Sequence, residues 1–373
     1  MIQLDNLTKI FETPDGTTTA ADHISMEVPT GEICVLLGPS GCGKTTTLKM
    51  INRIIPATSG RVLINGEDTT SLDTVDLRRN IGYVIQQIGL FPNMTIEENI
   101  SVVPRLLGWS KDKYTARAAE LLDMVALDPS IFLKRYPNEL SGGQQQRVGV
   151  IRALAADPPV MLMDEPFGAI DPINREVIQD EFLKMQQELK KTILFVSHDI
   201  DEAVKMGDKI AIFRDGKLEQ YASPDNILAH PANDFVAGFV GSDRTLKRLQ
   251  LVSAGEVMGQ APTSVKANQS LADALAVMNQ YEHKSITLVN DAHEPIGIVL
   301  KDTAQNHQGL CGEHYEGLHG FAQQNDDLRS VVAQMFSSDT SWLPVVNAEG
   351  KLVGDITQRG ITHHLGATYR TQR

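Results

Sequence analysis

Short apolar runs separated by longer mixed segments characterise the first 240 positions of the chain. Ile33–Leu37, 160–163 and 193–196 are uninterrupted apolar runs, typical of strands buried on both faces. Between them lie stretches with helical spacing, such as 178–189. Strands that alternate with helices predict an α/β fold built on a mostly parallel sheet.

Two other stretches show different patterns. Residues 1–28 alternate apolar and polar side chains around a turn at Pro14 and Gly16, which predicts antiparallel strands. The stretch from about 95 to 140 has helical spacing and is expected to form a helical subdomain. One apolar stripe marks it, made of Leu121, Leu122, Val125 and Leu127.

A glycine-rich loop follows the first buried strand and precedes a helical run. It matches G-x-x-x-x-G-K-[ST] in the strand–loop–helix setting that makes this pattern specific. Glycines let the backbone N–H groups curl around an anion, the lysine reaches the β- and γ-phosphates, and the hydroxyl can hold Mg²⁺. The sequence therefore predicts a nucleoside-triphosphate site formed by Gly38, Pro39, Ser40, Gly41, Cys42, Gly43, Lys44, Thr45 and Thr46.

Polar residues mark the ends of the other buried strands. Asp164 and Glu165 close the second run, and His198 follows the third. The carboxyl ends of parallel strands meet at one edge of an open sheet, where ligands bind. Two acids beside a phosphate loop are suited to hold Mg²⁺ and to activate water.

A second anion-binding pattern begins after Leu140. Ser141 and Gln144 have the spacing of a capping box that opens a helix. Gly142 and Gly143 leave the first N–H groups of that helix accessible to a phosphate. A simple N-cap does not require two glycines after the serine, so the pattern favours a ligand role.

Composition and charge exclude several classes of protein. A formal net charge of −13 argues against a nucleic-acid-binding protein, which usually carries a basic patch. Cys34, Cys42 and Cys311 form neither a zinc spacing nor a disulfide framework. No apolar run reaches the roughly 18 residues that span a membrane. We therefore expect a cytoplasmic chain whose membrane role, if any, comes through a partner.

These motifs resemble the ATP-hydrolysing subunit of ABC transporters, with every motif of that family in order over about the first 240 residues. The resemblance implies that Lys44 and Gln86, the Q-loop glutamine, act with the catalytic base Glu165 and the switch histidine His198. It implies further that the Walker A loop is Gly38 to Thr45 and that the D-loop aspartate is Asp171. The LSGGQ signature would include Ser141, Gly142, Gly143 and Gln144. Mg²⁺ would be held by Thr45, Gln86 and the Walker B residue Asp164.

The same resemblance implies an assembly. Each ATP is expected to lie between Walker A of one subunit and LSGGQ of the other, in a head-to-tail homodimer. The loop from Gln86 to Met94 would pass motion to a transmembrane permease. Phe11 stands alone among polar neighbours, and its pattern leaves edge packing and adenine stacking both open. The family places its adenine-stacking aromatic at this position.

The second half of the chain contains an internal repeat. Residues 270–278 align with 327–335 at an offset of 57, and the same offset aligns Gly297 with Gly354. Each unit is expected to run helix, strand, turn, strand, helix. The repeat resembles a pair of CBS domains, which implies an α+β tandem module after the ATPase domain.

The expected domains follow from these two resemblances. They are the nucleotide-binding domain 1–240, a linker 241–254, the CBS repeats 255–309 and 310–366, and a tail 367–373. In the CBS family one position usually carries a ribose-binding aspartate, but here Thr303 and Gly360 occupy it. Ordinary AMP or ATP binding is therefore not expected there, whereas a cyclic dinucleotide, ionic strength or dimerisation stay open as regulators.

The segment 306–320 carries metal-ligand residue types without a zinc spacing. These are His307, Cys311, His314 and His319. A polar loop is favoured over a metal site because the spacing fits no zinc pattern.

Among ABC ATPases, tandem CBS repeats resemble those of importers for quaternary-amine osmoprotectants, such as glycine betaine, carnitine, choline or proline betaine. The resemblance implies a peripheral ATPase on the cytoplasmic face of the membrane, working with a permease and an extracytoplasmic solute-binding protein. An importer for another solute would more often carry a β-rich C-terminal domain. A DNA- or ribosome-directed ABC ATPase would show heptads or basic patches, and a pure energy sensor would not need Glu165.

Overall fold

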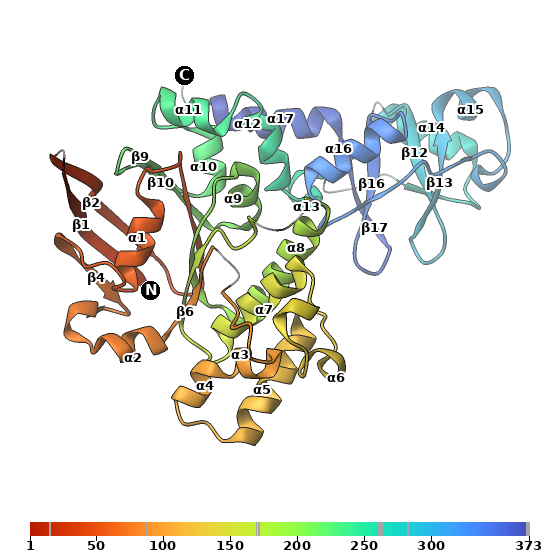
Figure 1. The fold of residues 1–373 in the computed structure, drawn as a ribbon. Coiled ribbons are helices and arrows are strands. Elements are labelled where there is room, and N and C mark those ends of the chain that lie inside the picture. Colours follow the sequence, from red (N-terminus) through yellow and green to blue (C-terminus); the bar gives the residue numbers. More distant parts are fainter. Residues whose placement is uncertain are drawn as a thin grey trace. The chain divides into compact units, whose positions relative to one another are not determined.

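The structure is a computed structural model that describes residues 1–14, 16–86, 89–168, 170, 172–259, 264–281 and 283–370. The chain divides into two compact units, Met1–Gly241 and Ser242–Arg373. Figure 1 shows strands and helices alternating in the first unit and two repeated α+β motifs in the second. The mixed α/β class that the apolar runs predict is confirmed.

A six-stranded sheet forms the centre of the first unit. Its order is β10-β9-β3-β8-β7-β6, and all neighbours are parallel except β10 and β9. The three apolar runs become β3 (Ile33–Leu37), β7 (Val160–Asp164) and β8 (Thr192–Val196), and every residue in them is buried. The remaining strands are β6 (Ile81–Val84), β9 (Lys209–Arg214) and β10 (Lys217–Ala222).

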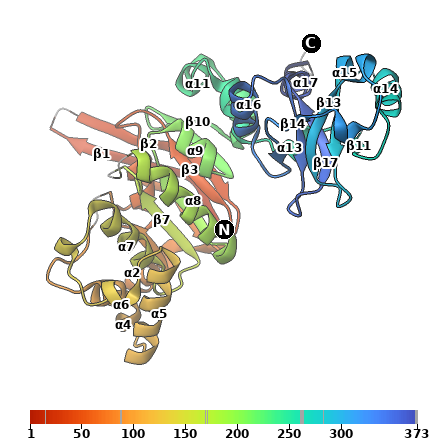
Figure 2. The ribbon, with the colours of Figure 1, turned by 90° about the vertical axis from the view of Figure 1, so that its right-hand side faces the viewer.

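Helices cover both faces of this sheet, as Figures 1 and 2 show. Helix α1 (Lys44–Ile51) lies on one face, while α8 (Pro172–Leu189) and α9 (Ile200–Met206) lie on the other. On the α8 side, the ring of Phe167 meets those of Phe182 and Phe195 edge to face, with centroids 5.9 and 6.3 Å away. This double cover explains why the strands are apolar throughout rather than alternating.

The first 28 residues form the antiparallel hairpin that their alternation predicts. Strands β1 (Ile2–Thr13) and β2 (Gly16–Val28) pair in a four-stranded sheet, followed by β4 (Ser59–Ile64) and β5 (Glu67–Asp68). The inward residues of this sheet pack with α1 and the central sheet in one core cluster. The hairpin therefore stands beside the phosphate loop that begins α1.

Short helices fill the stretch between β6 and β7. They are α3 (Ile96–Ile100), α4 (Val102–Leu106), α5 (Lys111–Met124), α6 (Pro129–Phe132) and α7 (Gly142–Leu154), of which α5 and α7 are the longest. The apolar stripe through Leu121, Leu122, Val125 and Leu127 is buried. A buried side chain, Asn99, holds the turn before α3 by accepting from the N–H of Phe91 and donating to the carbonyls of Phe91, Met94 and Thr95.

The second unit contains the two repeated motifs. The first has α14 (Leu271–Gln280), β12 (Ser285–Val289), β13 (Pro295–Leu300) and α15 (Lys301–Asn306). The second has α16 (Leu328–Ser337), β16 (Trp342–Val346), β17 (Leu352–Thr357) and α17 (Gln358–Arg370). The order helix, strand, strand, helix in each agrees with the repeat seen in the sequence. Helix α17 also includes residues 367–370 of the expected tail.

The two repeats exchange their leading segments. The N–H of Ala254 donates to Asp326 O at 2.7 Å, and the N–H of Cys311 donates to Gln269 O at 2.8 Å. These two contacts are related by the same offset of 57 residues. Ala254 joins the core of the second repeat, whereas Cys311 joins the core of the first. Each repeat thus completes the core of the other.

Of the segment 241–254, which is expected to be a linker, all residues after Gly241 belong to the second unit. It forms α12 (Arg244–Lys247) and a 3₁₀ turn at Arg248–Gln250, and α13 (Ala254–Val257) follows. Leu249 and Val252 are buried in the core of the second repeat. The burial of these apolar side chains stabilises the second unit, so the segment is part of its fold rather than a linker.

Candidate functional site

Two glycines of the phosphate loop are required by close packing as well as by conformation. Gly38 and Gly43 have φ angles of 142° and 102°. A Cβ at Gly43 would lie 2.0 Å from the carbonyl oxygen of Ala20, and one at Gly38 would lie 2.2 Å from that of Phe213. The loop therefore fits tightly between the hairpin strand β2 and the central strand β9. That fit fixes the curl of its backbone.

Lys44 is the first residue of α1, and its ammonium lies over the loop. Nζ donates to Gly38 O at 2.6 Å and to Pro39 O at 2.9 Å, and lies 3.6 Å from Cys42 Sγ. Burial raises the pKa of the Cys42 thiol, so this cysteine stays a neutral neighbour of the lysine. The cation is thus held where a phosphate cradled by the loop would meet it.

Thr45 and Asp164 bring two oxygen ligands together. The threonine hydroxyl donates to Asp164 Oδ1 at 2.8 Å across a separation of 119 residues. Asp164 ends β7 and is only 5% exposed. Burial raises the pKa of its carboxyl, while the Thr45 hydroxyl and nearby Lys49 and Lys44 act in the opposite direction. A hydroxyl and a carboxylate are the hard oxygen donors that Mg²⁺ prefers.

Glu165 lies between two residues from neighbouring strand ends. Gln86 Nε2 donates to its Oε2 at 2.9 Å, and His198 Nδ1 lies 3.8 Å from the same oxygen. Gln86 follows β6 and His198 follows β8, so three adjacent strands of the sheet contribute one side chain each. Glu165 has φ of 48°, an uncommon conformation for a non-glycine residue that is typical of functional sites.

The signature residues form the predicted capping box. The N–H of Gln144 donates to Ser141 Oγ at 3.4 Å, and the N–H of Ser141 donates to Gln144 Oε1 at 2.9 Å. Gly142 has no atom within 4 Å of an added Cβ, so the chain's own packing does not require a glycine there. Ser141 and Gly142 are exposed. The start of this helix is therefore open to a ligand or a partner.

The other predicted site residues lie around this centre. Phe11 is half-buried on β1 with Lys9 Nζ 4.9 Å from its ring centre, and it pairs with Thr18 on β2, the strand that touches Gly43. Thr46 is half-buried in α1. Asp171 lies outside the described residues.

The sequence did not indicate Glu202, a buried acid of α9 that contacts Ser197 beside His198. In the sequence its position looks like that of an exposed acid on a helix, so no local signal distinguishes it.

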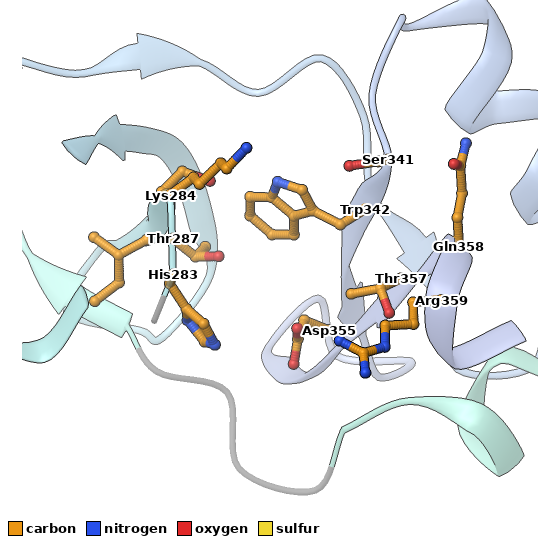
Figure 3. A pocket seen from close by; sticks show the side chains of 11 residues that line it. His283, Lys284, Thr287, Ser341, Trp342, Asp355, Thr357, Gln358 and Arg359 are labelled. Atoms are coloured by element: carbon orange, nitrogen blue, oxygen red, sulfur yellow. The ribbon is translucent and has the colours of Figure 1, made fainter. Parts of the chain in front are cut away.

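A separate cavity of about 410 Å³ opens between the two repeats of the second unit (Figure 3). Figure 3 shows the ring of Trp342 between residues of the first repeat and those of the second. The lining includes the charged or titratable side chains of His283, Lys284, Asp355 and Arg359. Gly360, the position where the family's aspartate was expected, follows Arg359 directly.

The segment 306–320, which carries the metal-ligand residue types, contributes a buried side chain to the second unit. Cys311 is fully buried, and its thiol lies 3.5 Å from Ser270 O. The rings of His307 and His314 are tilted by 36° with their centroids 5.0 Å apart. In the described part of the chain, no group of three or more His, Cys, Asp or Glu side chains could hold a metal ion. None of the helices described is long and apolar enough to cross a membrane.

Comparison with known proteins agrees with both halves of this structure. The family profile described as ABC transporter matches residues 21–168, and the CBS domain profile matches 254–303 and 321–367. The osmoprotectant import ATP-binding protein OsmV of Salmonella typhimurium strain LT2 is 58% identical over 100% of this chain and 98% of its own length. The glycine betaine/carnitine/choline transport ATP-binding protein OpuCA of Bacillus subtilis strain 168 is 44% identical over 97% and 95%.

Solved structures resemble the first unit. The dimeric bacterial ABC transporter cassette MJ0796 matches with a TM-score of 0.55 and 37% identity, over 60% of this chain and 98% of that one. The same cassette in a post-hydrolysis state with ADP and Pi matches with a TM-score of 0.55 and 36% identity, over the same shares of the two chains. The chain therefore belongs to the ABC transporter family, as an ATP-binding subunit that joins a nucleotide-binding cassette to two CBS domains.

Proposed function

We propose that this chain is the ATP-hydrolysing subunit of an importer for quaternary-amine osmoprotectants. The convergence of Gln86, Glu165 and His198 beside the Thr45–Asp164 pair is the observation that carries the ATPase part. The substrate class rests on relatives that match almost the full chain and are named for osmoprotectant, glycine betaine, carnitine or choline transport.

Each of these residues has a separate role in hydrolysis. Lys44 and the loop N–H groups neutralise the phosphate oxygens, and Glu165 accepts a proton from the attacking water as the water oxygen bonds to the γ-phosphorus. The bond from that phosphorus to the bridging oxygen breaks, and ADP leaves. His198 donates to the γ-phosphate, and Gln86 holds the Glu165 carboxylate in place. Phe11 stacks on the adenine.

The oxygen set at Thr45 and Asp164 fits Mg²⁺, with Gln86 supplying an amide oxygen of the same hard type. When bound, the ion would offset the negative charge that develops on the phosphate oxygens. The protein's part is to hold Asp164 buried and oriented by the Thr45 hydroxyl. Asp164 keeps its place because it is the last residue of a fully buried strand.

A head-to-tail homodimer accounts for the outward-facing signature. Gly142 is free of close neighbours in its own chain, yet it opens a 13-residue helix whose N–H groups can receive a phosphate. In the dimer, Ser141 to Gln144 of one subunit close over the Walker A loop of the other, and Asp171 lines the same interface. ATP binding joins the subunits and hydrolysis releases them.

A transmembrane permease and an extracytoplasmic solute-binding protein are the further partners that we propose. The chain then sits at the cytoplasmic face of the membrane as a peripheral subunit. The exposed side chain of Phe91, in the turn that Asn99 organises, is suited to meet the permease. The CBS pair regulates transport in response to ionic strength or a nucleotide.

ATP hydrolysis in liposomes tests this proposal. The vesicles hold the chain with its permease and solute-binding protein, and turnover is measured with glycine betaine, carnitine, choline, maltose or putrescine. We expect stimulation by the three quaternary amines alone. Stimulation by maltose or putrescine would assign the chain to another solute importer, and basal hydrolysis without any stimulation would favour a non-transport ABC ATPase. Repeating the assay at low and high internal salt separates ionic regulation from nucleotide regulation.

A further inference from the structure

A buried carboxylate that the proposed mechanism does not use lies beside the switch histidine. Glu202 stands in the first turn of α9 and is 7% exposed. Burial raises the pKa of its carboxyl, while hydrogen bonds from Ser197 and Gln179 act in the opposite direction. A carboxylate is costly to bury unless it is hydrogen-bonded, so the groups that bond to Glu202 are expected to be held in fixed positions.

Glu202 links the His198 segment to helix α8. The hydroxyl of Ser197, the residue before His198, donates to Glu202 Oε2. Gln179 Nε2 on α8 donates to Glu202 Oε1 at 3.0 Å. Ser197 and Gln179 are only 1% and 4% exposed. Both carboxylate oxygens are therefore occupied by fixed donors in a site from which water is excluded.

Helix α8 also contacts Asp199, the residue that follows His198. The N–H of Asp199 donates to Ser197 Oγ at 3.0 Å, and Asp199 Oδ2 lies 3.8 Å from Arg175 Nη1. Arg175 Nη2 also donates to Ile170 O at 3.1 Å. Arg175 and Gln179 are four residues apart, so they share one face of α8. That face contacts Asp199 directly and is linked to Ser197 through Glu202.

His198 itself has little packing to fix it. Its side chain is 64% exposed and lies 3.8 Å from Glu165. We infer that Glu202 and Arg175 are positioning residues, which hold the His198 backbone at the γ-phosphate and tie it to the segment after Glu165. This inference rests on the role proposed for His198, and it adds the groups through which that role is maintained.

Full-chain ATPase kinetics test the inference with Glu202→Ala, Glu202→Gln and the double variant Glu202→Ala/His198→Ala. Loss of the carboxylate should lower kcat by about 10- to 100-fold, because small misplacements of a catalytic group have effects of this size. The KM for ATP should change by less than about threefold, because the phosphate loop is untouched. Glutamine can keep both hydrogen bonds, so Glu202→Gln should retain most of the turnover. Glu176→Gln, which removes a charge from an exposed position of α8 next to Arg175, is the matched control and should behave like the parent.

The double variant decides between positioning and general stabilisation. If Glu202 acts through His198, adding Glu202→Ala to His198→Ala should change kcat by less than about twofold. Equal losses from Glu202→Ala in both backgrounds would overturn the inference, as would a loss confined to KM. An unaltered kcat in His198→Ala alone would instead contradict the proposed role of His198. Arg175→Lys provides an independent variant, since lysine cannot reach Asp199 and Ile170 O together, and its kcat loss should likewise vanish without His198.

Discussion

The side chains of Gln86 and Glu165 meet through a 2.9 Å hydrogen bond although 79 residues separate them in the chain. The glutamine amide donates to the same carboxylate oxygen that faces His198 at 3.8 Å. The hydrogen bond orients the carboxylate that we propose as the general base. The position of Glu165 therefore depends on Gln86, which follows the end of β6.

Replacement of Glu165 by glutamine should stop hydrolysis while sparing nucleotide binding. The amide keeps the shape of the side chain but cannot accept the proton, and general bases contribute about 10²- to 10⁴-fold in rate. Steady-state turnover and binding of a fluorescent ATP analogue check this result. Glu188→Gln, at an exposed acid of α8, is the control and should hydrolyse ATP normally. Turnover retained in Glu165→Gln would rule out this residue as the base.

Replacement of Asp164 by asparagine should weaken the affinity for Mg²⁺. Asparagine offers a neutral oxygen, so the Mg²⁺ concentration for half-maximal hydrolysis should rise by about 10- to 100-fold. The measurement is a Mg²⁺ titration of turnover, with nucleotide binding in a chelator as a second readout. Asp157→Asn, just before the same strand at its other end, should leave the titration unchanged. An identical titration for Asp164→Asn would speak against the proposed metal ligand.

Replacement of Gly142 by alanine should separate stability from function. The position has no neighbour within 4 Å, and alanine favours a helix over glycine by up to about 1 kcal/mol. The Tm should therefore stay level or rise, whereas ATP-dependent dimerisation in a Glu165→Gln background should fail. Gly238→Ala, an equally open glycine of helix α11 (Asp234–Val240), is the matched control. Normal dimerisation of Gly142→Ala would contradict the signature-to-Walker A interface.

The buried acid Glu202 should leave a signature in stability against pH. Its pKa is raised in the folded state, so the protonated form contributes stability that is present at low pH and lost as pH rises through the folded pKa. Asp199 adds to this shift and Arg175 opposes it. The Tm difference between Glu202→Gln and the parent should therefore grow in favour of the variant from about pH 5 to pH 7.5. A constant difference would mean that Glu202 has no shifted pKa.

Truncation after Gly241 should yield an active but unregulated subunit. The boundary between the two compact units lies there, and Leu249 and Val252 belong to the core of the second. In liposomes with the permease, import should continue while its response to internal salt or nucleotide disappears. Truncation after Leu251 should behave similarly but lose solubility, because it leaves Leu249 without its core. A salt response that survives truncation at Gly241 would place the sensor in the ATPase domain.

Features that depend on residues close together in the chain could be predicted from the sequence. The phosphate loop, the Ser141 capping box, the β1–β2 hairpin and the apolar strands could all be recognised, because each is set by local conformation or by burial on a regular period. The offset of 57 residues likewise predicted two equal motifs. These signals suffice for the α/β class and for an ATP site.

Which of these residues come together depends on the tertiary structure. The order of the strands brings Gln86 and His198 to one carboxylate oxygen of Glu165. Packing leaves no room for a Cβ at Gly43, whereas a Cβ at Gly142 would meet no atom within 4 Å. The exchange of Ala254 and Cys311 between repeats, and the burial of Glu202, also have no local signature. The physical reason is that such contacts join residues far apart in the chain, and their free energy depends on the shape of the surrounding core rather than on the pattern of neighbours.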